Sequence, residues 1–166
     1  MVALAASATP SRITAETSKC DRTLNAEERS LAKLFEKDRG QKRRTMRCDP
    51  VLAYVARMRA LDMAERGYFD HVNPDHDGPN VLIERAGYVL PSFYSRSRTA
   101  NNVEVIVAGR PTADAAWTAW LKSRHHRPLA LGTDRFYREQ TDYGVGFAQV
   151  PNSRYGSYWV LISARH

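Results

Sequence analysis

The C-terminal part of the chain carries two strand patterns joined by a short turn, and this pairing constrains the fold more than any other feature. Tyr143 to Val150 alternates in character, and Tyr158 to Ile162 is bulky, aromatic and β-branched. Pro151 to Gly156 supplies turn residues between them, so we expect an antiparallel hairpin. Gly144 and Gly146 favour a close approach of another backbone to the first strand.

Two helix patterns in the first half of the chain have clear boundary signals. Asn25 can cap the first helix, with Glu28 completing a capping-box pattern, and Gly40 stands where this helix should stop. Asp49-Pro50 predicts the start of a second helix, and Gly67 predicts its end. One face of the second helix is mostly apolar and should be buried; it holds Leu52, Val55, Ala56, Arg59 and Met63.

The middle of the chain is less regular. Residues 80–86 predict a short helix, and Val103 to Val107 predicts a strand. Residues 88–100 are rich in Ser and Arg, which favours a mobile loop or a ragged strand. Thr112 can cap a third long helix. The tryptophans on its apolar face are interpreted as core residues; that face holds Ala113, Ala116, Trp117, Trp120 and Leu121.

The order of these patterns, helices first and strands last, predicts an α+β domain built from packed layers. A length of 166 residues fits one domain better than two. Residues 1–22, rich in Ala, Ser and Thr, are predicted to form a flexible N-terminal arm, and residues 23–166 the folded domain. The sequence has no run of about 18 apolar residues, so we predict no transmembrane helix.

The two cysteines allow two interpretations. Cys20 and Cys48 each lie just before a predicted helix start, so one disulfide would tie the arm to the second helix and indicate an oxidising compartment. Two free buried thiols are the alternative. Residues 1–19 lack the apolar core of a signal peptide, and Val2 to Ala8 is interpreted as the remnant of a removed signal or as added sequence.

A net charge of +7 favours acidic partners, such as nucleic acid, anionic lipid or acidic glycan. The basic residues cluster in one stretch, at Lys37, Arg39, Lys42, Arg43, Arg44 and Arg47. This stretch is either a nucleic-acid or nuclear-localisation patch or, as we favour, a solvated loop between helices. Without zinc-finger spacing or an aromatic-basic RNA motif, we expect no specific nucleic-acid partner.

A few polar residues stand out as candidates for chemistry. His71 follows the aromatic pair Tyr68-Phe69, which should anchor the segment and fix the position of the imidazole. Glu104 is an acid inside an apolar strand, and a buried acid needs a partner. His126 lies three residues after Ser123, on the same face if the helix continues that far. The sequence contains no H-E-x-x-H, C-x-x-C, P-loop or G-x-S-x-G motif.

The run from Asp62 to His71 resembles the bacterial branch of the CAP superfamily, which contains the cysteine-rich secretory proteins, venom antigen 5 and plant pathogenesis-related proteins. Other segments between about Leu24 and Ser163 resemble that family in the same order. They are Asp49–Leu52, Ala86–Tyr88, Asn102–Glu104, Trp120–Ser123 with His126-Arg127, Tyr143–Phe147 and Tyr158–Val160.

The resemblance implies a three-layer α-β-α sandwich with a small antiparallel sheet and a central cleft. It implies that His71 and Glu104 face this cleft, with His126 nearby. It also implies a secreted or periplasmic protein, here without a signal peptide in the chain. Ser123 and Tyr158 stand where eukaryotic members have their second glutamate and second histidine, which weakens the expectation of a zinc site.

Three functions follow from these residues. We favour a monomeric, non-enzymatic module that binds a lipid, glycan or cell-wall component, or an anionic surface, through a cleft with His71, Glu104, His126 and Tyr158. A protease-like hydrolase would use Ser123 as nucleophile, His126 as base and Glu104 as the orienting group. A divalent-metal site for zinc, magnesium or calcium would use His71, Glu104 and His126.

Overall fold

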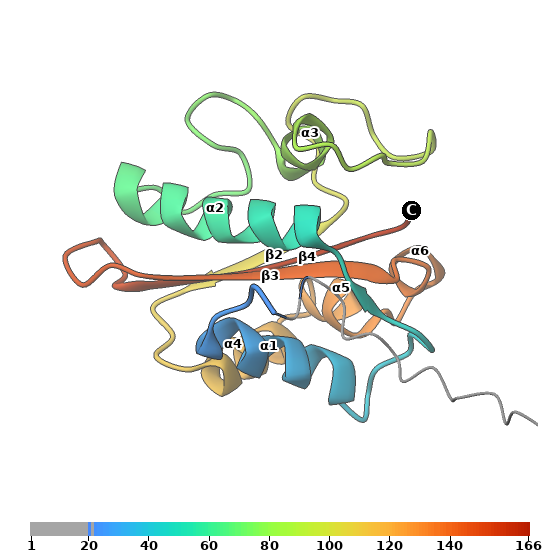
Figure 1. Ribbon diagram of the computed structural model, residues 1–166, viewed down its shortest axis with the longest axis horizontal. Helices are drawn as coiled ribbons and strands as arrows, with labels where there is room; N and C mark the ends of the chain where they lie inside the picture. Colours follow the sequence, from blue (N-terminus) through green and yellow to red (C-terminus); the bar gives the residue numbers. More distant parts are fainter. Residues whose placement is uncertain (1–19, 21) are drawn as a thin grey trace, which may run out of the picture.

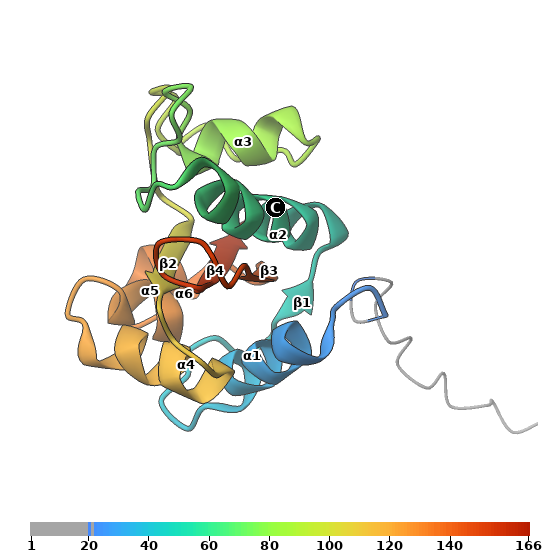
Figure 2. The same cartoon turned by 90° about the vertical axis from the view of Figure 1, so that its left-hand side faces the viewer.

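Helices cover both faces of a four-stranded sheet in the computed structural model, which describes residue 20 and residues 22–166 (Figures 1 and 2). One face carries α2 (Pro50–Arg66) and α3 (Pro79–Arg85). The other carries α1 (Ala26–Lys37), α4 (Ala113–Lys122) and α5 (Arg127–Leu131), and the short α6 (Arg135–Arg138) lies at one end of the sheet. The α-β-α sandwich is confirmed. Most of the arm predicted for residues 1–22 lies outside the described residues.

The sheet is mixed rather than purely antiparallel. Its strands follow the order β1 (Arg47–Cys48), β3 (Asp142–Gln149), β4 (Ser157–Ala164) and β2 (Glu104–Ala108). The predicted hairpin of β3 and β4 is confirmed, and β2 also pairs antiparallel with β4. β1 pairs parallel with β3, Arg47 opposite Asp142. The prediction of a purely antiparallel sheet was wrong because it did not include β1. A strand of two residues is too short to show the alternation of apolar and polar residues by which strands are recognised in a sequence.

The helix boundaries follow the predicted signals. The side chain of Asn25 accepts from the Glu28 amide while the Glu28 carboxylate accepts from the Asn25 amide, so the capping box is complete. Asp49 caps α2, and Gly67 ends it in the left-handed conformation at φ 70°. α1 ends at Lys37, earlier than Gly40, because the backbone leaves helical geometry at Asp38.

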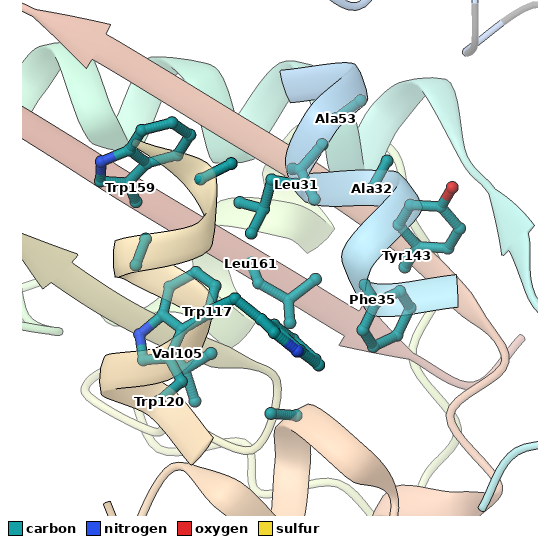
Figure 3. Close-up of a cluster of buried hydrophobic side chains, with 14 of the residues drawn as sticks. Leu31, Ala32, Phe35, Ala53, Val105, Trp117, Trp120, Tyr143, Trp159 and Leu161 are labelled. Carbon is teal, nitrogen blue, oxygen red and sulfur yellow. The ribbon is translucent and has the colours of Figure 1, made fainter. Parts of the chain in front are cut away.

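Two apolar cores lie on either side of the sheet. Figure 3 shows the core beneath α1 and α4, where Trp117 and Trp120 pack against Trp159 and Leu161 from β4. Both tryptophans of α4 are buried, as predicted. The second core lies between the sheet and α2, and it contains Ile162. The sheet residues alternate between these cores, which fixes the face on which each side chain lies.

Helix α2 packs directly on the backbone of β3. A Cβ atom at Gly144 would lie 2.1 Å from the backbone nitrogen of Ala53, and one at Gly146 would lie 2.2 Å from the carbonyl carbon of Ala56. The close backbone approach predicted for the two glycines is therefore confirmed. Because no side chain separates the helix from the strand, the position of α2 relative to the sheet is closely defined.

Residues 88–100 form no strand, contrary to one of the two expectations for this segment. Tyr88, Leu90 and Tyr94 are buried in the core next to α2. The side-chain amide of Asn80 donates to the Ser95 carbonyl at 3.0 Å and to the Asn102 side chain at 2.9 Å. This dense packing argues against the mobility predicted for residues 88–100, because three large buried side chains and the hydrogen bonds of the Asn80 amide hold the segment in place.

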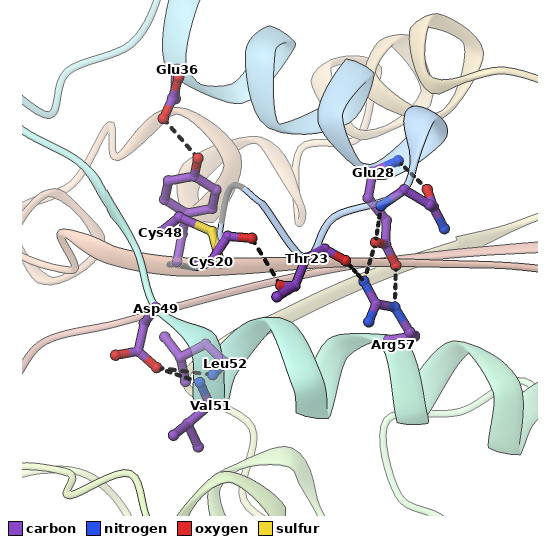
Figure 4. The surroundings of a disulfide bond; sticks show 11 residues. Cys20, Thr23, Glu28, Glu36, Cys48, Asp49, Val51, Leu52 and Arg57 are labelled. Carbon is purple, nitrogen blue, oxygen red and sulfur yellow. Dashed lines mark hydrogen bonds and ion pairs between the residues drawn. A yellow bond between two sulfur atoms is a disulfide. The ribbon is translucent and has the colours of Figure 1, made fainter. Parts of the chain in front are cut away.

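A disulfide joins Cys20 to Cys48, the last residue of β1, with 5.7 Å between their Cα atoms (Figure 4). Both cysteines are buried. Of the two interpretations of the cysteines, the disulfide is therefore the one the structure shows. Beside it, Arg57 of α2 pairs with Glu28 of α1, with 2.8 Å from Nε to Oε1, so the same corner is also held by an ion pair.

Reducing this disulfide should lower the free energy of unfolding by about 3–4 kcal/mol, because the crosslink restrains a loop in the unfolded chain. The two cysteines are 28 residues apart. The measurement is urea unfolding with and without a phosphine reductant, followed by tryptophan fluorescence. The Cys20→Ala/Cys48→Ala variant is the control and should not respond to reductant. An unchanged midpoint for the reduced natural chain would contradict the prediction.

Candidate functional site

Glu104 lies at the start of the edge strand β2 with a fully buried side chain. It sits opposite Ile162 on the sheet face that α2 covers. Its carboxylate accepts from Arg59 Nε at 3.0 Å and from His71 Nδ1 at 2.9 Å. The partner predicted for a buried acid is thus present, and it is a pair of cationic or polar groups from α2 and the following loop.

Arg59 is the residue that sequence reasoning missed. It is buried on α2, and its Nη2 also donates to the carbonyl oxygens of Asp70 at 2.8 Å and His71 at 3.0 Å. Nη1 donates to the Tyr68 hydroxyl. One guanidinium therefore joins the strand, the helix and the loop that carries His71. The available signal was a charged residue within the apolar face of α2, a position where an arginine needs a buried partner.

We refer to Arg59, His71 and Glu104 as the Glu104 network. Burial by itself raises the pKa of Glu104, but the charge of Arg59 and the hydrogen bonds from His71 and Arg59 outweigh it and hold that pKa below its usual range. Glu104 is therefore a carboxylate at neutral pH and can only accept hydrogen bonds. His71 must then carry a proton on Nδ1. Its side chain is 32% exposed, so Nε2 can contact a ligand.

His126 lies at the junction of α4 and α5, where it is the residue before the first turn of α5. It is half-buried, and its pKa is lowered by burial first and then by the charges of His71 and His125. His126 makes no hydrogen bond to Glu104 among the contacts of the described residues.

Ser123 ends α4, and its hydroxyl accepts from the backbone amide of His126 at 3.3 Å. This is the geometry of a helix-end cap. Within residues 22–166 the Ser123 hydroxyl has no hydrogen bond to an imidazole, and Glu104 orients His71 rather than His126. The structure therefore does not bring Ser123, His126 and Glu104 together in the order that a triad requires.

The metal hypothesis meets a similar obstacle. Among the described residues, no group of three or more His, Cys, Asp or Glu side chains is placed to hold a metal ion. Both oxygens of Glu104 already accept hydrogen bonds, and the Arg59 guanidinium supplies the positive charge at that carboxylate. A divalent ion would have to displace or repel this guanidinium, so the residues present do not fit a metal centre.

Tyr158 lies away from the accessible part of the site. It is fully buried in the core next to α2, and its hydroxyl has no hydrogen-bond partner among the described residues. Its ring contacts Tyr155 edge-on at 5.9 Å between centroids. Tyr158 therefore supports the surface aromatic residue above it, and its own side chain is not open to a ligand.

A pair of half-exposed aromatic rings lies beside the His71 loop. Phe69 is 39% exposed and Tyr155, from the β3–β4 turn, is 37% exposed, with 5.5 Å between the ring centroids. The Arg154 guanidinium lies 5.2 Å from the Tyr155 centroid. The expectation that Tyr68 and Phe69 both anchor the loop is thus correct only for Tyr68, because Phe69 presents its ring to solvent.

A model of the cysteine-rich secretory protein family, CAP, matches residues 25–163 of the chain. This match spans most of the sequence and runs from α1 to β4, of which it leaves out only the last residue.

The chain belongs to the CAP family.

Relatives of this CAP domain include the uncharacterised protein YkwD of Bacillus subtilis, which is 28% identical over 144 residues. That alignment covers 86% of this chain and 49% of YkwD, so the chain spans about half the length of its relative. No helix in the described part of the CAP domain is long and apolar enough to cross a membrane.

Two solved structures share the fold of the CAP domain. An extracellular SCP-domain protein of Bacillus anthracis matches with a TM-score of 0.65 and 21% identity, over 98% of this chain and 45% of the other. An outer surface protein of Borrelia burgdorferi matches with a TM-score of 0.55 and 17% identity, over 82% of this chain and 87% of the other. At these identities the likeness concerns the fold alone.

Proposed function

We propose that this CAP domain is an extracellular, non-enzymatic module that binds a glycan at the rim formed by His71, Phe69 and Tyr155. The observation that carries the proposal is the restraint on His71. Its Nδ1 is bonded to a buried carboxylate, and its loop is held by Arg59 through two carbonyl oxygens. Because the side chain is 32% exposed, its Nε2 is a preorganised polar group for a ligand, which lowers the entropy lost on binding.

The aromatic pair supports a glycan rather than a lipid as the ligand. The C–H faces of a sugar ring pack against an aromatic ring, while its hydroxyls require polar partners close by. Phe69 and Tyr155 offer two partly exposed rings, and His71 follows Phe69 by two residues. Ligand sites combine apolar or aromatic surface with a few fixed polar groups in this way. An acyl chain would need a deeper apolar surface than these two rings provide.

Binding without catalysis is supported by what the polar groups already do. Glu104 is held by Arg59 and His71, and Ser123 caps a helix end. Neither group is placed to act as nucleophile or base in the described structure. An extracellular location is supported by the disulfide between Cys20 and Cys48 and by the extracellular and outer-surface neighbours of the fold.

The test is co-sedimentation of the purified domain with bacterial peptidoglycan, an insoluble glycan that can be washed and quantified. The His71→Ala and Phe69→Ala variants should each bind about tenfold more weakly, because each removes one contact from the centre of the surface. His76→Asn is the matched control. His76 is an exposed loop histidine at φ 63°, where asparagine keeps the backbone unstrained, and its binding should equal that of the natural chain.

Equal binding by all three variants would show that the glycan, if bound at all, uses another surface. His71-dependent binding to phosphatidylcholine vesicles, without binding to peptidoglycan, would replace the glycan by a lipid. Thermal unfolding of each variant checks that its fold is intact.

A further inference from the structure

A polar concavity lies where β1 and β3 begin and β4 ends. The register places Arg47 opposite Asp142, and Asp142 opposite Ala164, so these three strand ends are neighbours. The concavity has a volume of about 740 Å³. Its charged lining consists of Lys42, Arg44, Arg138, Glu139 and Arg165. We call it the basic cavity. None of its lining residues belongs to the Glu104 network.

The connection that supplies Lys42 and Arg44 is fixed by the residue between them. Arg43 points inward and is buried, where it donates to the carbonyls of Gln140 and Leu129 at 2.7 Å each. Its guanidinium also lies over the Phe35 ring at 5.1 Å. The residues on either side of it, Lys42 and Arg44, are both exposed. The inward arginine thus holds two exposed cations in place.

The positive charge of the basic cavity is poorly balanced. Burial lowers the pKa of Arg43 to about 10, which still leaves it protonated at neutral pH. Arg138 donates to the carbonyls of Gly132 and Thr133. Within the described residues, no ion pair is formed by four of the cations here: Lys42, Arg43, Arg44 and Arg138. The one acid of the lining, Glu139, is shared by Arg165 and Arg135. The lining therefore carries an excess of positive charge, which favours a negative ligand.

The lining also indicates what kind of anion fits. The lining contains guanidinium and ammonium groups and also the hydroxyls of Thr45 and Thr141. Such a set of hydrogen-bond donors suits phosphate oxygens. The lining contains no aromatic ring on which a nucleic-acid base could stack. We propose that the basic cavity binds the phosphodiester chain of an anionic cell-surface polymer.

The experiment measures binding of fluorescein-labelled poly(glycerol phosphate) to the full chain by fluorescence anisotropy over a series of salt concentrations. The Lys42→Ala/Arg44→Ala variant should bind about tenfold more weakly at low salt. Each lost phosphate contact should reduce the slope of log affinity against log salt by about 0.7, so the double variant should lose about 1.4. Both residues are exposed and unpaired among the described residues, so their removal should leave thermal unfolding unchanged.

The matched control is Lys33→Ala/Lys37→Ala, which removes the same charge from exposed positions on α1 that line a different concavity. It should keep most of the affinity. If it weakens binding as much as Lys42→Ala/Arg44→Ala, the charge of the whole chain and not the basic cavity is responsible, and the proposal fails. Tighter binding of single-stranded DNA with the same number of phosphates would also overturn it. His71→Ala should bind the polymer normally, which separates this result from the glycan test.

Discussion

Replacing Arg59 with methionine should lower the free energy of unfolding by about 3–5 kcal/mol. The substitution keeps an unbranched apolar side chain but removes the guanidinium that faces the buried Glu104 carboxylate at 3.0 Å. Removing one member of a buried pair is costly because the other charge stays buried without its partner. The carbonyls of Asp70 and His71 lose their donor at the same time. Urea unfolding followed by tryptophan fluorescence measures the loss.

Two further variants separate this effect from a general loss of charge. Arg59→Met/Glu104→Leu removes both members of the pair and should recover much of the stability, because apolar residues can replace a buried ion pair at little cost. Arg66→Met removes the exposed pair with Asp75 and should leave the unfolding midpoint nearly unchanged. If Arg59→Met is no more destabilising than Arg66→Met, then Glu104 does not depend on Arg59 for its stability in the core.

Gly144→Ala is expected to destabilise the domain by about 3 kcal/mol, at the upper end of what overpacking usually costs. The new methyl group would lie 2.1 Å from backbone atoms of α2, so either the helix or β3 must move by more than an ångström. Such a movement would also displace Arg59, since α2 carries it. Thermal unfolding measures the loss, and failure to fold would be its extreme form.

Gly156→Ala provides the comparison for this prediction. Gly156 lies in the β3–β4 turn at φ 73°, and a Cβ atom there would meet nothing within 4 Å. The alanine should therefore cost only the strain of the left-handed conformation, about 1–2 kcal/mol. Equal losses for Gly144→Ala and Gly156→Ala would mean that the contact between α2 and β3 is loose enough to absorb a methyl group.

The parts of the fold that were predictable from sequence are those determined by neighbours in the chain. The capping box of Asn25 and Glu28 is local, and so is the β3–β4 turn, and both were found. β1 was missed because its pairing with β3 joins residues nearly a hundred positions apart, with only two residues to show it. Local patterns cannot reveal a pairing of this kind.

The candidate site shows the same limit in its side chains. Glu104 could be recognised as a buried acid in need of a partner. The position of Arg59 on the apolar face of α2 made it a candidate, but the sequence did not show that these two residues, 45 positions apart, would meet. In the basic stretch, sequence favoured a solvated loop. The structure buries Arg43 and leaves Lys42 and Arg44 exposed. Which of several adjacent cations turns inward depends on carbonyl groups supplied by α5 and the segment before β3, far along the chain.

The positions of the two cysteines have a consequence for the order in which the molecule assembles. Cys20 and Cys48 both lie within the first third of the chain, whereas β3, the partner of β1, begins at Asp142. During synthesis the thiols therefore emerge long before the sheet can exist, and they can be oxidised on a nascent chain that has no β-structure. A crosslink made at that stage holds β1 beside the N-terminal segment, so that β3, on its arrival, meets an edge already in place.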